Sequence, residues 1–235
     1  LTLGSSTSDL TIENAITIDS SGEGILTGEA DLILLSALTM SQGLLGSTGG
    51  TWEFSGDFNK SIGTISISET DLTLRESITL ISDEALGFAT LSLNYHTLTL
   101  GSPDSDLTVS NAITINASGE GILTGEADLI LMSSLKMSQG LLQSSGGIWK
   151  LKGDFEKTGG TLSITETDLT LTNNITLTSD EALSFVTLNL NDFTLTLGSS
   201  TSDLTVQNAI TLDTSTEGIL TGVADLTVKS DVTLA

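Results

Sequence analysis

The sequence predicts an all-β protein, a single parallel β-solenoid, and three observations lead to this fold class. The chain repeats itself every 97 residues, a decapeptide recurs inside each repeat, and apolar and polar residues alternate along each half of the decapeptide. Repetition at a fixed period is typical of solenoids, in which each repeat stacks on its neighbours. Alternation with a period of two is the pattern of a half-buried β-strand.

The long repeat divides the chain into two complete units and part of a third. Residues 20–45 return almost unchanged at 117–142, and a further copy begins at 214. We expect units at residues 1–97, 98–194 and 195–235, joined in one continuous solenoid that is a segment of a larger protein. Because one catalytic centre needs one set of residues, repetition indicates that length, rigidity or a repeated surface is the product.

The decapeptide sets the expected coil length. It reads Asp-Leu-Thr-apolar, a short bend, then apolar-Thr-apolar in most copies, and it begins at Asp9, Asp31, Asp71, Asp106, Asp128, Asp168, Asp203 and Asp225. Degenerate copies near Thr51 and Thr90 fill the longer gaps. With these included, we expect about 19–20 residues per coil and five coils per unit, too short a coil to contain a helix. Right-handed coiling is expected, because crossovers between parallel strands are overwhelmingly right-handed.

Each decapeptide predicts two short strands around a bend. In the first copy, Leu10 and Ile12 point toward the core, and Ile16 and Ile18 point the same way after the bend. The threonines between them face outward. Successive coils then pair in parallel, about 4.8 Å apart.

Bends and turns form the expected corners of the coil. Asparagine tolerates left-handed backbone angles, so we expect such angles at the bend residues Asn14, Asn111, Asn173 and Asn208. Glycine-containing turns such as STGG supply other corners. Pro103, the only proline, falls in a turn-like SPDSD, and the strands are left free for continuous pairing.

The composition excludes some classes of partner. Thirty acidic and seven basic residues give a formal net charge of −23, so the basic patch that nucleic-acid binding requires is missing. We interpret the acidity as self-repulsion that keeps a rod soluble. No run of eighteen apolar residues exists, so we expect no membrane span in this segment.

No recurring residue set predicts catalysis, and we expect a non-enzymatic protein. Serine-histidine-aspartate chemistry needs a histidine, and His96, the only one, lies in an expected surface turn. Zinc chemistry lacks cysteine ligands. The carboxylates of Glu23 and Glu29 recur in the second unit instead of converging on one cleft. We interpret Trp52 and Trp149, once per unit, as a bulky plug or a surface tryptophan on the variant coil, and the alternative is a repeated carbohydrate or partner contact. We therefore assign no catalytic, cofactor-binding or metal-binding residue.

Calcium is the alternative that the acidic residues leave open. Asp9 and Asp31 hold the same position on adjacent coils, as do Asp106 and Asp128, and stacked carboxylates repel unless a cation, a backbone N–H or water screens them. Because aspartate before a strand commonly accepts backbone N–H groups, capping is the favoured interpretation. No cofactor is expected on this basis.

The strings GGTWEFSGDF, GTISISETDLTL and GGTLSITETDLTLTNNITL resemble the β-helical repeats of bacterial autotransporters, filamentous-haemagglutinin-like adhesins and large repetitive surface proteins. The resemblance implies a bacterial or archaeal extracellular or cell-surface rod that serves as an adhesin, spacer or fibre. Its partners would be neighbouring units, identical rods or surface glycans. Two alternatives stay open: a polysaccharide-binding or -cleaving β-helix, and an ice- or crystal-binding solenoid.

Overall fold

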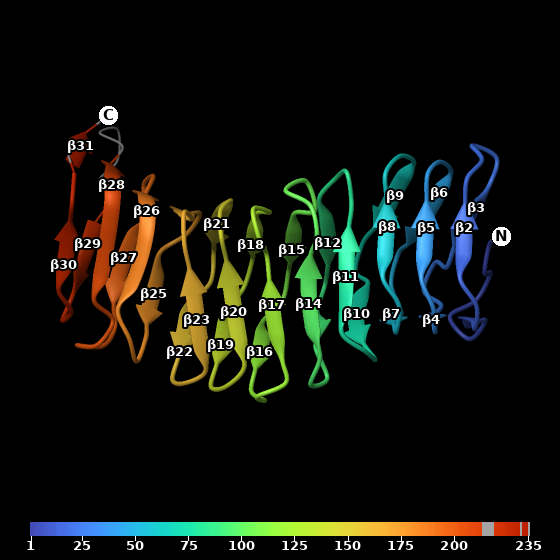
Figure 1. Ribbon diagram of the computed structural model, residues 1–235, viewed down its shortest axis with the longest axis horizontal. Coiled ribbons are helices and arrows are strands. Elements are labelled where there is room, and N and C mark those ends of the chain that lie inside the picture. Colours follow the sequence, from blue (N-terminus) through green and yellow to red (C-terminus); the bar gives the residue numbers. More distant parts are fainter. Residues whose placement is uncertain (213–218, 231, 235) are drawn as a thin grey trace.

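The chain forms an elongated stack of coils, with the first and last strands at opposite ends (Figure 1). The computed structural model describes residues 1–212, 219–230 and 232–234. The start of the third copy of the segment 20–45, at 214–218, and Asp231 lie outside the described residues. Every strand pair is parallel, and the described residues contain strands but no helix. The predicted all-β parallel solenoid is confirmed, whereas the hand of the coil stays a prediction.

As far as β25 (Ile175–Thr178), strands three apart in the sequence pair, so each coil contributes one strand to each of three sides. Beyond it, the long strands β26 (Leu183–Asn189) and β28 (Leu204–Leu212) each run through a corner, and most pairs join strands two apart. One side begins as a sheet of β1 (Leu10–Ile12), β4 (Leu32–Leu34), β7 (Thr51–Phe54), β10 (Asp71–Leu74) and β13 (Leu91–Ser92). The next side is a sheet of β2 (Ile16–Ile18), β5 (Leu38–Met40), β8 (Phe58–Lys60), β11 (Ile78–Ile81), β14 (Thr97–Leu100), β17 (Gly121–Leu123), β20 (Leu141–Ser144) and β23 (Thr161–Ile164). The third begins with β3 (Gly24–Leu26), β6 (Leu44–Ser47) and β9 (Thr64–Ile67).

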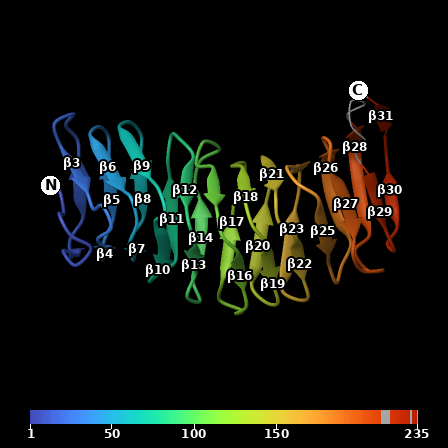
Figure 2. The same cartoon turned by 180° about the vertical axis from the view of Figure 1, so that it is seen from behind.

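Two further sheets complete the rod. The view from behind shows the same stack of strands running from one end of the molecule to the other (Figure 2). The larger contains β12 (Leu86–Phe88), β15 (Leu107–Val109), β18 (Leu129–Leu131), β21 (Ile148–Leu151), β24 (Asp168–Leu171), β26 (Leu183–Asn189), β28 (Leu204–Leu212), β30 (Leu226–Val228) and β31 (Val232–Leu234). The smaller contains β16 (Ile113–Ile115), β19 (Leu135–Met137), β22 (Phe155–Lys157), β25 (Ile175–Thr178), β27 (Thr194–Leu197) and β29 (Ile219–Gly222).

The strand register corrects the expected coil length. Five successive pairings carry Leu107 to Ile210, so five coils take 210 − 107 = 103 residues. The mean coil is therefore 103/5 = 20.6 residues, slightly longer than the 19–20 expected. The 97-residue unit is 103 − 97 = 6 residues short of five coils, which is one short strand and its bend. The strand equivalent to β1 is β15, fourteen strands later, so one unit holds four and two-thirds coils.

The inward positions of the decapeptide are buried as predicted. Leu107 and Val109 of β15 and Ile113 and Ile115 of β16 are at most 1% exposed. Their side chains join one hydrophobic cluster that extends from Ile18 to Ile210. Leu10 is only partly buried, because β1 pairs with a neighbouring coil on one side only. Apolar burial along this shared core is the main stabilising term of the fold.

The corners follow the predicted glycines but not the predicted asparagines. Gly147 in the second STGG-like turn has a φ of 69°, and a Cβ there would lie 2.5 Å from the carbonyl oxygen of Ala127 on the preceding coil. The expectation of left-handed angles at the four bend asparagines is wrong. Among the non-glycine residues that the structure describes, such angles occur at Glu69, Asn94, Tyr95, Glu166 and Asn191. At Asn173 the side chain instead bonds the preceding coil, with Nδ2 donating to Lys152 O at 3.2 Å.

Candidate functional surface

The repeated aspartates form hydrogen bonds between coils. Asp106 Oδ1 accepts the backbone N–H of Asp128 at 2.8 Å, and Asp128 Oδ1 accepts that of Ile148 at 2.8 Å. The first unit repeats this ladder, with Asp31 N–H donating to Asp9 Oδ1 at 3.2 Å. The favoured interpretation, capping by backbone N–H groups, is thus confirmed for these aspartates. Each carboxylate joins a corner to the coil above it.

The repeated glutamates have a local role as well. Glu120 Oε2 accepts the backbone N–H groups of Asn116 at 2.7 Å and Ala117 at 3.1 Å, which closes the ASGEG turn. Glu23 makes the equivalent bonds to Asp19 and Ser20. These bonds account for the recurrence of this glutamate in both units. Glu29 and its counterpart Glu126 have no such bond among the described residues.

Two lysines are buried at equivalent positions of the two units, and the sequence did not predict this repeated feature. Lys60 and Lys157 occupy the same position in successive units, and their side chains are 1% and 2% exposed. Lys157 Nζ lies 2.5 Å from Asp180 Oδ1 and 3.1 Å from Glu181 Oε1 on the next coil. Lys60 pairs likewise with Asp83 and with Glu84 at 3.2 Å. The signal was present, since lysine replaces an apolar residue at an inward position that is Ile18 and Met40 on the preceding coils.

The carboxylates keep the buried amine charged. Burial by itself lowers the pKa of Lys157, but the hydrogen bonds to Asp180 and Glu181, with the charges of both, outweigh that effect and raise the pKa above its ordinary value. A buried charge of this kind is tolerated only when it is paired. We therefore interpret each lysine as a clamp between coils.

The two tryptophans are core plugs. Trp52 and Trp149 are 1% exposed, and each packs edge-on against a phenylalanine of a later coil, Phe88 or Phe185. Their Nε1 atoms have no hydrogen-bond partner among the described residues. The alternative, a repeated carbohydrate contact through the indole face, is wrong because both rings are inside the rod.

His96 lies in the turn after β13, as expected. Its backbone N–H donates to Leu93 O at 2.8 Å. Within the described part of the chain, no group of three or more histidine, cysteine, aspartate or glutamate side chains is placed to hold a metal ion.

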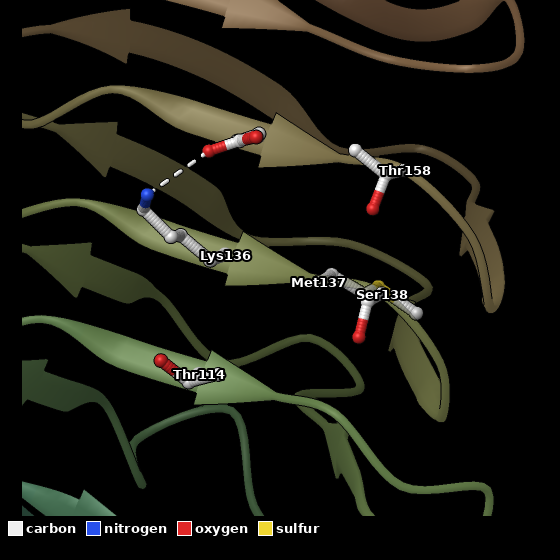
Figure 3. A pocket seen from close by; sticks show the side chains of 6 residues that line it. Thr114, Lys136, Met137, Ser138 and Thr158 are labelled. Carbon is white, nitrogen blue, oxygen red and sulfur yellow. Dashed lines mark ion pairs between the residues drawn. The ribbon is translucent and has the colours of Figure 1, made fainter.

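The outward faces carry mixed side chains. On three successive coils, Thr114 of β16 is followed in register by Lys136 of β19 and Glu156 of β22. Figure 3 shows these side chains around a shallow hollow of about 220 Å³, with the ion pair between Lys136 and Glu156 at 3.2 Å. In the first unit the equivalent positions are Thr17, Thr39 and Asn59, without charge. This hollow is therefore not a repeated site.

A larger hollow recurs in both units, and we call it the corner notch. In the first unit it has a volume of about 620 Å³ and is lined by Ile67, Ser68, Glu69, Asp71, Gly87, Phe88, Ala89, Thr90, Ser110 and Asn111. It forms because only Ala89 and Thr90 separate β12 from β13, whereas three residues form the corners of the coils below and above. The short corner is recessed between two longer ones.

The notch of the second unit is smaller, about 230 Å³, and its lining residues all occupy positions equivalent to notch residues of the first unit. Ser184 and Val186 replace Gly87 and Ala89, and Gln207 Nε2 donates to Ser184 Oγ at 2.8 Å across it. Larger side chains thus fill the same recess. The recess therefore recurs because the short corner recurs. Since its lining residues differ between the two units, it is not one repeated chemical site.

Comparison with known proteins adds no relative: no protein-family model matches the chain, and neither a curated protein nor a solved structure is detectably similar to it. The fold is that of a β-solenoid, consistent with β-helical adhesin-like proteins in general. In the ranges that the structure describes, no helix has the length and apolar character needed to cross a bilayer.

Proposed function

We propose that this chain is a structural and adhesive rod segment of a large, repetitive extracellular surface or fibre protein. The observation that carries the proposal is the unbroken passage of one sheet through both units. The sheet from β2 to β23 covers residues 16 to 164, so the repeat boundary at 97/98 interrupts neither the pairing nor the core. Such stacking joins units end to end into a rod.

The use of the polar residues supports a structural role. Asp106, Asp128 and Glu120 accept backbone N–H groups, and the buried lysines clamp adjacent coils. The recurrence of these particular residues in each unit is thus explained by the stability of the stack. The net charge of −23 keeps such rods apart in solution.

The same features favour the rod over the two alternatives. A polysaccharide-cleaving β-helix needs an acid and a base on either side of a bound sugar, and the aspartates of the ladder are occupied by backbone groups. An ice- or crystal-binding face needs a regular outward lattice, whereas the column Thr114, Lys136, Glu156 mixes a hydroxyl with both charges.

Surface exposure and glycan chemistry test the proposal together. Antibodies raised against the folded chain should label intact cells of the producing organism, and beads coated with the chain should bind to cells or glycans more strongly than beads coated with denatured chain. Labelling only after the cells are opened would contradict the proposal. So would the release of reducing ends from a polysaccharide panel by the purified chain.

A further inference from the structure

The 97-residue unit is one strand shorter than five whole coils. Equivalent residues of successive units therefore lie on different sides of the rod. Leu10 lies in β1, in the sheet that ends with β13. Its equivalent, Leu107, lies in β15, which pairs with β12 and β18. Because β12 lies next to β9, this is the side that begins with β3. One unit therefore shifts the same residue by one side of the rod.

The next unit shifts it again. Leu204, the third equivalent, pairs through β28 with Leu183 at the beginning of β26. That part of β26 lies beside β23, the last strand of the side that begins with β2. Three consecutive units thus place one sequence position on all three sides.

We infer that an array of these units displays equivalent surface positions on the three sides in turn, so that it binds separate partner molecules around its circumference and not one flat surface. Equivalent positions return to the same side only after three units. By the strand count these are fourteen coils, about 67 Å of rod at ~4.8 Å per coil. A flat lattice such as ice would meet equivalent residues only at that interval.

The kind of partner follows from this spacing. Equivalent sites on neighbouring units are about 22 Å apart along the axis, at ~4.8 Å per coil, yet they face different directions. Two partner proteins wider than this separation would exclude each other if both were bound on the same side of the rod. They would not do so if they were bound on two different sides. Simultaneous occupancy of neighbouring units then raises avidity for a population of mobile partners. This statement about partners rests on the proposed function, whereas the geometry does not.

Spin-label distances test the geometry in the 235-residue chain. Thr39 of β5 and Lys136 of β19 are equivalent, exposed positions on different sheets, and Gln143 of β20 is an exposed position on the sheet of β5, five coils away. Nitroxides at Thr39→Cys and Lys136→Cys should be farther apart than at Thr39→Cys and Gln143→Cys, although the first pair is closer along the axis. The axial separations of the two pairs are nearly equal, about 22 and 24 Å at ~4.8 Å per coil, and only the first pair is also separated across the rod, from one side to another. Equal distances, or a shorter distance for the first pair, would overturn the inference.

Stoichiometry tests the statement about partners. With biotin attached through short linkers at the same cysteines, the Thr39/Lys136 chain should bind two monovalent streptavidins and the Thr39/Gln143 chain only one, as counted by native mass spectrometry. Equal stoichiometry for the two variants would contradict separate binding around the rod. A normal label distance with equal stoichiometry would leave the geometry intact and remove only the statement about partners.

Discussion

Lys157 and Glu181 meet across two adjacent coils of the rod, with the buried Nζ 3.1 Å from the exposed carboxylate. The two ends of this pair differ in exposure, since the lysine side chain is 2% exposed and the glutamate 47%. Removal of one end or of the other should therefore have unequal effects.

Loss of the carboxylates should cost far more stability than loss of the lysine. Asp180→Ala with Glu181→Ala leaves a buried unpaired ammonium and should lower the free energy of unfolding by about 2–4 kcal/mol. Lys157→Met leaves two half-exposed carboxylates that water hydrates, and it should change that free energy by less than about 1 kcal/mol. Urea denaturation followed by circular dichroism measures both. If the methionine variant were the less stable, the clamp would not act through burial of its charge.

The stability of the rod should respond to alkaline pH through Lys157. Because its pKa is raised in the fold, its contribution is complete below the unfolded lysine pKa of about 10.4 and is lost as the pH rises through the folded value. The melting temperature should consequently fall more steeply above about pH 10.4 in the native chain than in Lys157→Met. Parallel pH profiles for the two chains would contradict this assignment.

The inward and outward positions of one strand should differ sharply in tolerance. Ile113→Asp places an unpaired charge at a core position that is 1% exposed, so it should lower the free energy of unfolding by more than about 4 kcal/mol or prevent folding. The neighbouring Thr114→Ser lies on the exposed side and should change it by only a few tenths of a kcal/mol. Similar melting temperatures for both variants would show that the assigned orientation of this strand is wrong.

Calcium should have little effect on stability. Asp128 Oδ1 accepts the N–H of Ile148, and Oδ2 bonds Lys150 Nζ at 2.9 Å, so both oxygens have partners. We expect calcium and EDTA to give melting temperatures within about 1 °C of each other, because a ligand stabilises only when it binds the folded state. A rise of several degrees with millimolar calcium, absent with magnesium, would instead support the cation interpretation of the ladder.

The sequence predicted the solenoid and the burial of Leu107, Val109, Ile113 and Ile115 because strand alternation and repetition are local signals. It did not predict the bend angles. The bend at Asn173, for example, has no left-handed angle, and its side chain bonds Lys152 of the preceding coil, a contact that exists only once the coils are stacked. Coil length was underestimated for a related reason. Five whole coils were assigned to the 97-residue unit, whereas the register, which depends on which residues lie above one another, places only four and two-thirds coils in it.

The functional residues were harder to predict than the fold. The position of the aspartates before a strand predicted that they accept backbone N–H groups. It did not predict that the donor lies on the next coil, because that pairing is visible only once the coils are stacked. The lysine clamp needs the same knowledge, because Lys60 and Asp83 are 23 residues apart and meet only after coiling. The corner notch arises from the relative lengths of three corners, which no single stretch of sequence reveals.

The length of the rod tests the central claim most directly. One further copy of residues 98–194 is inserted directly after Thr194, so that the 97-residue period continues without a break. Small-angle scattering should then show that the longest dimension of the particle grows by about 22 Å, four and two-thirds coils at ~4.8 Å each, with an unchanged cross-section. A particle that grows in cross-section, or whose length stays the same, would contradict a continuous solenoid rod.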